Sequence, residues 1–342
     1  MSRKLFVTGG ESRTGDCVCE EAFAKDSKWR DFFEEVRTTY TPHLEAVALS
    51  NLGVKQYNDI DVAFARVDDW KNMMQGSNIV VMVPEASVHK VKIAETCLQA
   101  INECAISDVI LISSQGCTQT GHPALAEFML IEELAKKTLG STNGRLTILR
   151  AAHYYQNLFL YAEEIKDTDT LSLALQPDAQ LAMVDVRDVA GVVVRIASMD
   201  GGDRIDKKYA NRTITLTGPD SLSGGEMVRK MSKVLDKKIE FKHINQAANR
   251  ELLSLIEGMD DSEIELILEE FELANTGTLG YITHDMDKIL GHPGLSFDDW
   301  FNEAKDEFVK PEENVPPPQA QPPKASGRKR TERAGDTRRR EE

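Results

Sequence analysis

The sequence predicts an α/β protein in which a doubly wound parallel sheet carries a smaller C-terminal α/β lobe and a disordered tail. Three observations favour this fold class. Short apolar segments alternate with helical patterns over the first 150 residues. Two of the segments, 78–84 and 108–114, are largely apolar, as strands buried on both faces of a parallel sheet are. The first segment runs directly into a glycine-rich turn, which is typical of a strand that leads into a helix.

The elements of the first half follow in a regular order. The predicted strands cover residues 4–8, 36–40, 54–57, 78–84, 108–114 and 145–150. The predicted helices cover residues 16–24, 43–52, 89–104 and 122–139. Because crossovers between parallel strands are right-handed, this order predicts the Rossmann arrangement, with helices on both faces of the sheet.

Beyond residue 150 the pattern is looser. Residues 182–198 begin as a strand and become a helix, and residues 238–244 form another strand. Residues 212–235 read as a strand, a Gly-Pro turn and a helix capped by Ser223. Residues 246–274 hold two acidic helices, the second capped by Asp261 or Ser262. The region is predicted to form a small α/β lobe over the open end of the sheet.

Composition excludes several classes of protein. The chain has 342 residues and a formal net charge of −15, which argues against a nucleic-acid surface spread over the fold. Its five cysteines are scattered and no His/Cys group has zinc-ligand spacing, so we predict no metal site and a reducing compartment. Neither a signal peptide nor an apolar run of membrane-spanning length is recognised, so we expect a cytoplasmic location and no membrane partner.

The segment 310–342 differs from the rest of the chain. Six of the twelve prolines lie in 311–323, and the segment has nine Lys or Arg and six Asp or Glu. This composition predicts a disordered tail, because it cannot repay the entropy of folding. The basic clusters at 328–330 and 338–340 resemble a nuclear-import signal, or they belong to a solubilising tail without an address. Specific DNA recognition is not predicted, since no aromatic residues lie between the clusters.

The glycine-rich turn has the chemistry of a phosphate-binding loop. In "LFVTGGESRTG" (5–15), Gly9 and Gly15 occupy the outer positions of a G-x-x-G-x-x-G pattern, and Ser12 replaces the middle glycine. Backbone N–H groups at a helix N-terminus favour a pyrophosphate, and the Ser12 hydroxyl could donate a further hydrogen bond. The predicted cofactor-binding residues of the loop are Gly9, Gly10, Ser12, Arg13, Thr14 and Gly15. A plain strand–helix turn without a ligand is the alternative.

The choice between NADP and NAD is read after the second strand, where residues 39–41 indicate neither. Arg13, Arg37 and His43 slightly favour NADP, and NAD stays open. Asp59, which follows the third strand, is predicted near the adenine, or is a turn residue. We therefore divide the chain into a dinucleotide-binding core (1–150), an interleaved substrate or partner lobe (151–309) and the tail (310–342).

Five stretches now occur in an order that resembles one family. They are "VTGGESRTG", "HPALAEFMLIEEL", "TILRAAHYYQN", "VDVRDVA" and "TITLTGPDSLS". Over about residues 3–309 the chain resembles the NmrA-like family of atypical short-chain dehydrogenases. The resemblance implies a Rossmann fold that binds a nicotinamide dinucleotide.

The chain departs from that family at the catalytic positions. Short-chain dehydrogenases use a Tyr as proton donor and a Lys four residues later. Aligning Glu132 with the family's helix places Phe128 at the Lys position and Ala124 at the Tyr position. Ser113 occupies the position of the active-site serine. Pro84, Ser113 and Phe128 join the predicted cofactor-binding residues, which completes that set.

His153 and Tyr154 are the predicted replacements for the missing proton donor, since they follow a strand and face the expected crevice. The alternative is that they pack and hydrogen-bond without a catalytic role. Three functions stay open. The protein is a dinucleotide-sensing regulator with a protein partner on its C-terminal lobe, an NAD(P)H-dependent reductase of a small carbonyl, imine or enone, or a scaffold that binds no nucleotide.

Overall fold

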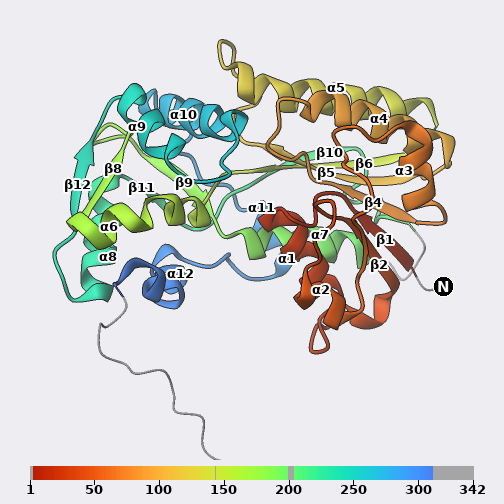
Figure 1. Cartoon of the computed structure of the whole chain (residues 1–342), viewed down its shortest axis with the longest axis horizontal. Coiled ribbons are helices and arrows are strands. Elements are labelled where there is room, and N and C mark those ends of the chain that lie inside the picture. Colours follow the sequence, from red (N-terminus) through yellow and green to blue (C-terminus); the bar gives the residue numbers. More distant parts are fainter. Residues whose placement is uncertain (1–2, 143, 199–203, 311–342) are drawn as a thin grey trace, which may run out of the picture. The chain divides into compact units, whose positions relative to one another are not determined.

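A seven-stranded, fully parallel sheet forms the centre of the protein (Figure 1). The computed structural model describes residues 3–142, 144–198 and 204–310, and those up to Val309 belong to one compact unit. The strand order is β10-β6-β5-β4-β1-β2-β3. The strands are β1 (Arg3–Val7), β2 (Phe33–Thr39), β3 (Lys55–Tyr57), β4 (Ile79–Met82), β5 (Asp108–Ser114), β6 (Arg145–Ala151) and β10 (Arg212–Leu216). The predicted doubly wound parallel sheet is confirmed.

Helices cover both faces of this sheet, which is why β4 and β5 are buried along their whole length (Figure 1). One face carries α3 (Val67–Met74), α4 (Lys90–Glu103) and α5 (Pro123–Ser141). The other carries α1 (Arg13–Phe23), α2 (Val47–Leu52), α7 (Val186–Ser198) and α11 (Asp285–Leu290).

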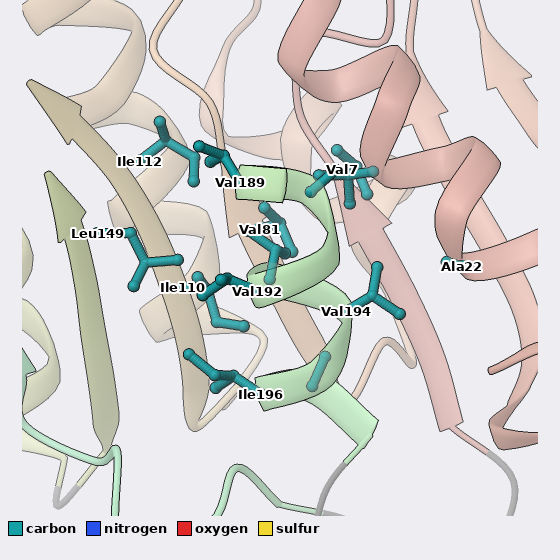
Figure 2. Close-up of a cluster of buried hydrophobic side chains, with 14 of the residues drawn as sticks. Val7, Ala22, Val81, Ile110, Ile112, Leu149, Val189, Val192, Val194 and Ile196 are labelled. Atoms are coloured by element: carbon teal, nitrogen blue, oxygen red, sulfur yellow. The ribbon is translucent and has the colours of Figure 1, made fainter. Parts of the chain in front are cut away.

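The alternation of side chains along the strands builds two separate cores. Figure 2 shows the core beneath α7, where Val189, Val192 and Ile196 meet strand residues such as Val81 and Ile110. The intervening strand residues point to the opposite face and pack under α3, α4 and α5. Each core therefore holds one layer of helices to the sheet by burial of apolar surface.

A third core lies in the C-terminal part of the chain. Two small sheets form there, from β7 (His153–Tyr154), β9 (Leu181–Val184) and β11 (Ser221–Leu222), and from β8 (Thr170–Leu173) and β12 (Glu240–His243). The helices around them are α6 (Ala162–Thr168), α8 (Gly224–Leu235), α9 (Gln246–Ser254), α10 (Asp261–Asn275) and α12 (Phe297–Ala304). This mostly aliphatic core contains a cluster of aromatic rings, in which Tyr155 is stacked on Trp300 at 5.4 Å between centroids.

Three predicted helix starts were wrong. The helix predicted from residue 16 begins at Arg13. The helix predicted from residue 43 begins at Val47, because His43 has a φ of +62° and its N–H donates to the Asn58 carbonyl in a turn. The cap of α10 is Asp260, whose carboxylate accepts the Ser262 N–H. The predicted Ser223 cap of α8 is confirmed. The tail from residue 311, with both basic clusters, lies outside the described residues, and the domain boundary at 150 stays a prediction.

Candidate functional site

The point where the sheet reverses direction defines the candidate site. Strands β1 and β4 are neighbours, yet the chain continues from them toward opposite edges of the sheet. In open α/β sheets, ligands bind in the crevice that forms at the carboxyl ends of such a pair. The segments that leave these two strands are the glycine-rich loop and residues 83–85. They set the chemistry of the crevice.

The loop is fastened to the end of β2. The N–H of Gly9 donates to Oγ1 of Thr39 at 2.8 Å, and the N–H of Gly10 donates to the Thr39 carbonyl at 2.9 Å. Gly9 has a φ of +68°, which side-chain-bearing residues rarely adopt. A Cβ on Gly15 would lie 2.0 Å from the Gly9 carbonyl oxygen. The close approach of α1 to the loop therefore requires glycine.

The Ser12 side chain forms its hydrogen bonds within the loop itself. Its hydroxyl donates to the Gly9 carbonyl at 2.7 Å and accepts the N–H of Gly15 at 3.1 Å, so the residue is the N-cap of α1. This engages the hydroxyl that we predicted to be available to a phosphate. Arg13 and Thr14 open the helix, and their N–H groups have no acceptor among the described residues. Two such N–H groups at a helix N-terminus have the chemistry that suits an anion.

Two glutamates that the sequence analysis overlooked lie at the mouth of the loop. A Cβ on Gly9 would lie 2.9 Å from Oε1 of Glu85, so the Glu85 carboxyl group lies directly beside the turn. Burial raises the pKa of Glu85 to about 8, and the neighbouring Glu11 adds to the rise. Burial also raises the pKa of Glu11. The available signal was the acid inside the loop and the acid directly after Pro84.

Arg13 turns away from this mouth. Its guanidinium lies 5.2 Å from the centroid of the Phe159 ring. With Asn157, Glu257 and Glu263 it lines a cavity of about 220 Å³ beside the start of α1. The side chain predicted to pair with a phosphate therefore faces the C-terminal lobe in this structure.

The N-terminus of α5 has no side chain that could transfer a proton at either family position. Ala124 and Phe128 are both buried. The carboxylate of Glu269, on α10, accepts the N–H of Ala124 at 3.0 Å and that of Leu125 at 2.8 Å. A carboxylate at a helix N-terminus is electrostatically favourable. Glu269 thus joins α10 to the start of α5, where the sequence alignment places the family's tyrosine.

Ser113 belongs to a buried polar network. Its hydroxyl donates to Glu132 at 2.8 Å, and Arg150 donates to both oxygens of Glu132 at 2.8 and 2.7 Å. Burial alone would raise the pKa of Glu132, but the hydrogen bonds from Arg150 and Ser113 outweigh it and lower the pKa to about 2. The network ties β5 and β6 to α5.

His153 and Tyr154 are both engaged with other parts of the chain. His153 is buried, and its Nδ1 donates to Glu270 at 2.7 Å, while Ser114 donates to the other carboxylate oxygen at 3.2 Å. The Tyr154 hydroxyl accepts from Thr14 at 3.1 Å. Burial raises the pKa of Tyr154 to about 12, which makes it a weaker acid than an ordinary tyrosine.

The remaining predicted residues lie at separate places. Pro84 is half-buried and lines a small cavity together with Thr8 and Glu85. Asp59 is exposed in the turn after β3. Arg37, which favoured NADP in the sequence, pairs with Glu35 at 2.6 Å and is thereby engaged.

The described ranges hold no cluster of three or more His, Cys, Asp or Glu side chains suited to a metal ion. Within those ranges, every helix is too short or too polar to cross a membrane.

The sheet order and the glycine-rich turn before α1 define a Rossmann-type protein. Residues 1–290 match the sequence model of the NmrA-like family, so the chain belongs to the NmrA-like family. The family resemblance predicted from the five stretches is thereby confirmed.

Individual relatives are distant. The (4-alkanoyl-5-oxo-2,5-dihydrofuran-3-yl)methyl phosphate reductase of Streptomyces griseus subsp. griseus is 27% identical over 163 residues, which are 48% of this chain and 54% of the relative. The chain spans about half the length of the curated relatives it matches.

Solved structures share the fold at low identity. The Escherichia coli NADPH-dependent quinone oxidoreductase, complexed with NADPH, has a TM-score of 0.72 at 15% identity, over 88% of this chain and 99% of that chain. NmrA, a negative transcriptional regulator in complex with NADP, has a TM-score of 0.66 at 14% identity, over 90% of this chain and 97% of that chain. The same fold thus occurs in a reductase and in a regulator.

Proposed function

We propose that this protein binds NADP(H) at the loop before α1 and acts as a dinucleotide-sensing regulator that lacks short-chain dehydrogenase chemistry. The start of α5 supports the absence of short-chain dehydrogenase chemistry. The family's catalytic positions hold Ala124 and Phe128, and Glu269 caps the helix N-terminus beside them. Without a proton donor at this point, bound dinucleotide has no partner for the usual transfer of hydride and proton.

Support for the cofactor comes from the loop itself. The free N–H groups of Arg13 and Thr14, the positive end of α1 and the tight packing at Gly15 suit a diphosphate. NADP is preferred over NAD because two proteins that share the fold are solved with NADP or NADPH. The regulator would bind a protein partner through the lobe 151–309. The basic tail would direct its import into the nucleus.

An NAD(P)H-dependent reductase of a small carbonyl, imine or enone is the second candidate. Both curated relatives are reductases. The cavity of about 220 Å³ beside Arg13 and Asn157 could admit a small substrate. His153 is the acid in this alternative, and its contact with Glu270 would orient the ring.

Calorimetric titration with NADPH and with NAD, followed by NADPH oxidation over a panel of quinones, imines and enones, tests the two functions. We expect binding of NADPH with no turnover above the uncatalysed rate. Turnover that disappears in His153→Gln would establish the reductase instead. If the protein bound neither dinucleotide, the regulator and the reductase would both be rejected. The remaining function would be a scaffold that binds no nucleotide.

Dinucleotide affinity is expected to depend on Glu85. Below its pKa of about 8 the side chain is neutral, and above it a second negative charge joins Glu11 at the loop. We expect the Kd for NADPH to rise roughly tenfold between pH 7 and pH 9, where the phosphates of the ligand no longer titrate. Glu85→Gln should bind with the same affinity at both pH values.

The exposed Glu133 provides a matched control, because Glu133→Gln removes a carboxylate from the same protein far from the loop. It should retain the pH dependence of the wild type. A pH profile that is identical in wild type and Glu85→Gln would contradict the proposed repulsion.

A further inference from the structure

Lys90 is a buried cation that the mechanism above does not use. It opens α4, yet its side chain is only 1% exposed. Lysine is almost never fully buried without compensation, and the N-terminus of a helix disfavours positive charge. The placement is therefore costly in two ways.

The contacts of the Lys90 ammonium leave part of it free. Within the described ranges, Nζ lies 3.1 Å from Oε2 of Glu127 and 4.8 Å from the centroid of the Phe128 ring. An ammonium group carries three N–H donors. One carboxylate and one ring face do not satisfy all three. Lys90 can therefore donate to hydroxyl groups that enter the crevice.

The position of the ammonium connects the two halves of the site. Phe128 occupies the place where short-chain dehydrogenases carry the lysine that holds the nicotinamide ribose, and Lys90 lies over its ring. The stem of Lys90 also lines a small cavity with Thr8 and Glu85, the residues that follow β1 and β4. The cation thus stands between α5 and the switch point of the sheet.

We propose that Lys90 replaces the missing lysine, and that its ammonium binds the hydroxyls of the ribose attached to the nicotinamide. This inference rests on the proposed dinucleotide binding. The charge reaches the site from α4 instead of α5, and the Phe128 ring supports it by a cation–π contact. Lys90 would then orient the nicotinamide half of the cofactor, whereas the loop holds the diphosphate.

Lys90→Met tests the proposal without endangering the fold. The residues around the stem include Trp70, Met82 and Cys97, so an apolar side chain suits the pocket. Removing one partner of an ion pair is costly when the other charge is left buried, whereas the loss of the buried charge itself is often neutral or stabilising once no unpaired buried charge remains. Glu127, the former partner, is 31% exposed and stays hydrated. Thermal unfolding should show no loss of stability.

Two ligands separate the halves of the site. NADPH contains both riboses joined by a diphosphate. Adenosine 2′,5′-bisphosphate keeps the adenine half and lacks the nicotinamide riboside together with one phosphate of the diphosphate. For Lys90→Met we expect the Kd of NADPH to rise about 10- to 100-fold, the loss of a charged hydrogen bond, and the Kd of the bisphosphate to stay within about twofold. Lys90→Gln, which keeps an N–H donor, should lose less. Lys92→Met, an exposed lysine two residues along, should change neither by more than about twofold.

Three results would overturn the inference. Unchanged NADPH affinity in Lys90→Met would show that the ammonium contacts no part of the cofactor. Equal weakening of both ligands would place its effect on the adenine half or on the fold. Failure of the wild type to bind either ligand would reject the proposed function, and the inference with it. The first two results leave dinucleotide binding intact, so the two failures are distinguishable.

Discussion

Replacing Gly15 with alanine is expected to abolish NADPH binding. The new Cβ would lie 2.0 Å from the Gly9 carbonyl oxygen, a distance at which backbone atoms must move. The start of α1 would then separate from the turn, and the Arg13 and Thr14 N–H groups would no longer converge on a diphosphate. Calorimetric titration should detect no heat of binding at NADPH concentrations that saturate the wild type.

A second glycine in the first turn of a helix provides the control. Gly225 lies near the start of α8, and a Cβ there would meet no atom within 4 Å. Gly225→Ala should keep full affinity and gain up to about 1 kcal/mol of stability from its higher helix propensity. Gly15→Ala should lose about 1–3 kcal/mol through overpacking. If Gly15→Ala remains folded and binds NADPH normally, the loop is a structural turn without a ligand.

The sheet could be predicted because its signal is local. Strand β4 is apolar along its length and β5 is apolar in its central four residues, and the glycines of the first turn report their own backbone conformation. These features do not depend on distant contacts. The short helix α3 was not predicted, because eight residues form a helix only when packing stabilises them. Trp70 supplies that packing against Phe6, with ring centroids 6.4 Å apart.

The chemistry of the site could be predicted only in part, because its contacts join distant segments. Glu269 caps α5 from 145 residues away, and Glu270 reaches His153 from 117 residues away. No periodicity in α10 distinguishes these glutamates from the solvent-facing acids of the same helix. Ser12 was recognised as unusual, but its role as a cap became visible only from the geometry of its hydroxyl.

The ion pair of the buried Glu132 with the half-buried Arg150 has a structural role in α5. The family's helix motif contains this glutamate, and here it fastens the helix to β5 and β6 by hydrogen bonds from Ser113 and Arg150. Four residues earlier the same helix carries the buried Phe128, whose ring contacts the Lys90 ammonium. The sequence alignment that starts from Glu132 predicts that Ala124 and Phe128 stand at the family's catalytic positions.

Removing the carboxylate is expected to destabilise the protein strongly. Glu132 is fully buried, so Glu132→Ala would leave the half-buried Arg150 guanidinium without its partner. Breaking a buried ion pair in this way costs about 3–5 kcal/mol, which urea unfolding followed by circular dichroism would measure. Glu133→Ala, at the exposed neighbouring position, should change the free energy of unfolding by no more than about 0.5 kcal/mol.

The contribution of Glu132 should also depend on pH in a defined direction. Its pKa in the folded protein is lowered to about 2, so the folded state favours the ionised form more than the unfolded state does. The wild type should keep this stabilisation at neutral pH and lose it as the pH falls from about 5 to about 2, whereas Glu132→Ala lacks it throughout. Replacing Glu132 and Arg150 together with methionine should recover most of the loss, because no unpaired charge remains. A double variant as unstable as Glu132→Ala would show that shape, and not charge pairing, makes this position indispensable.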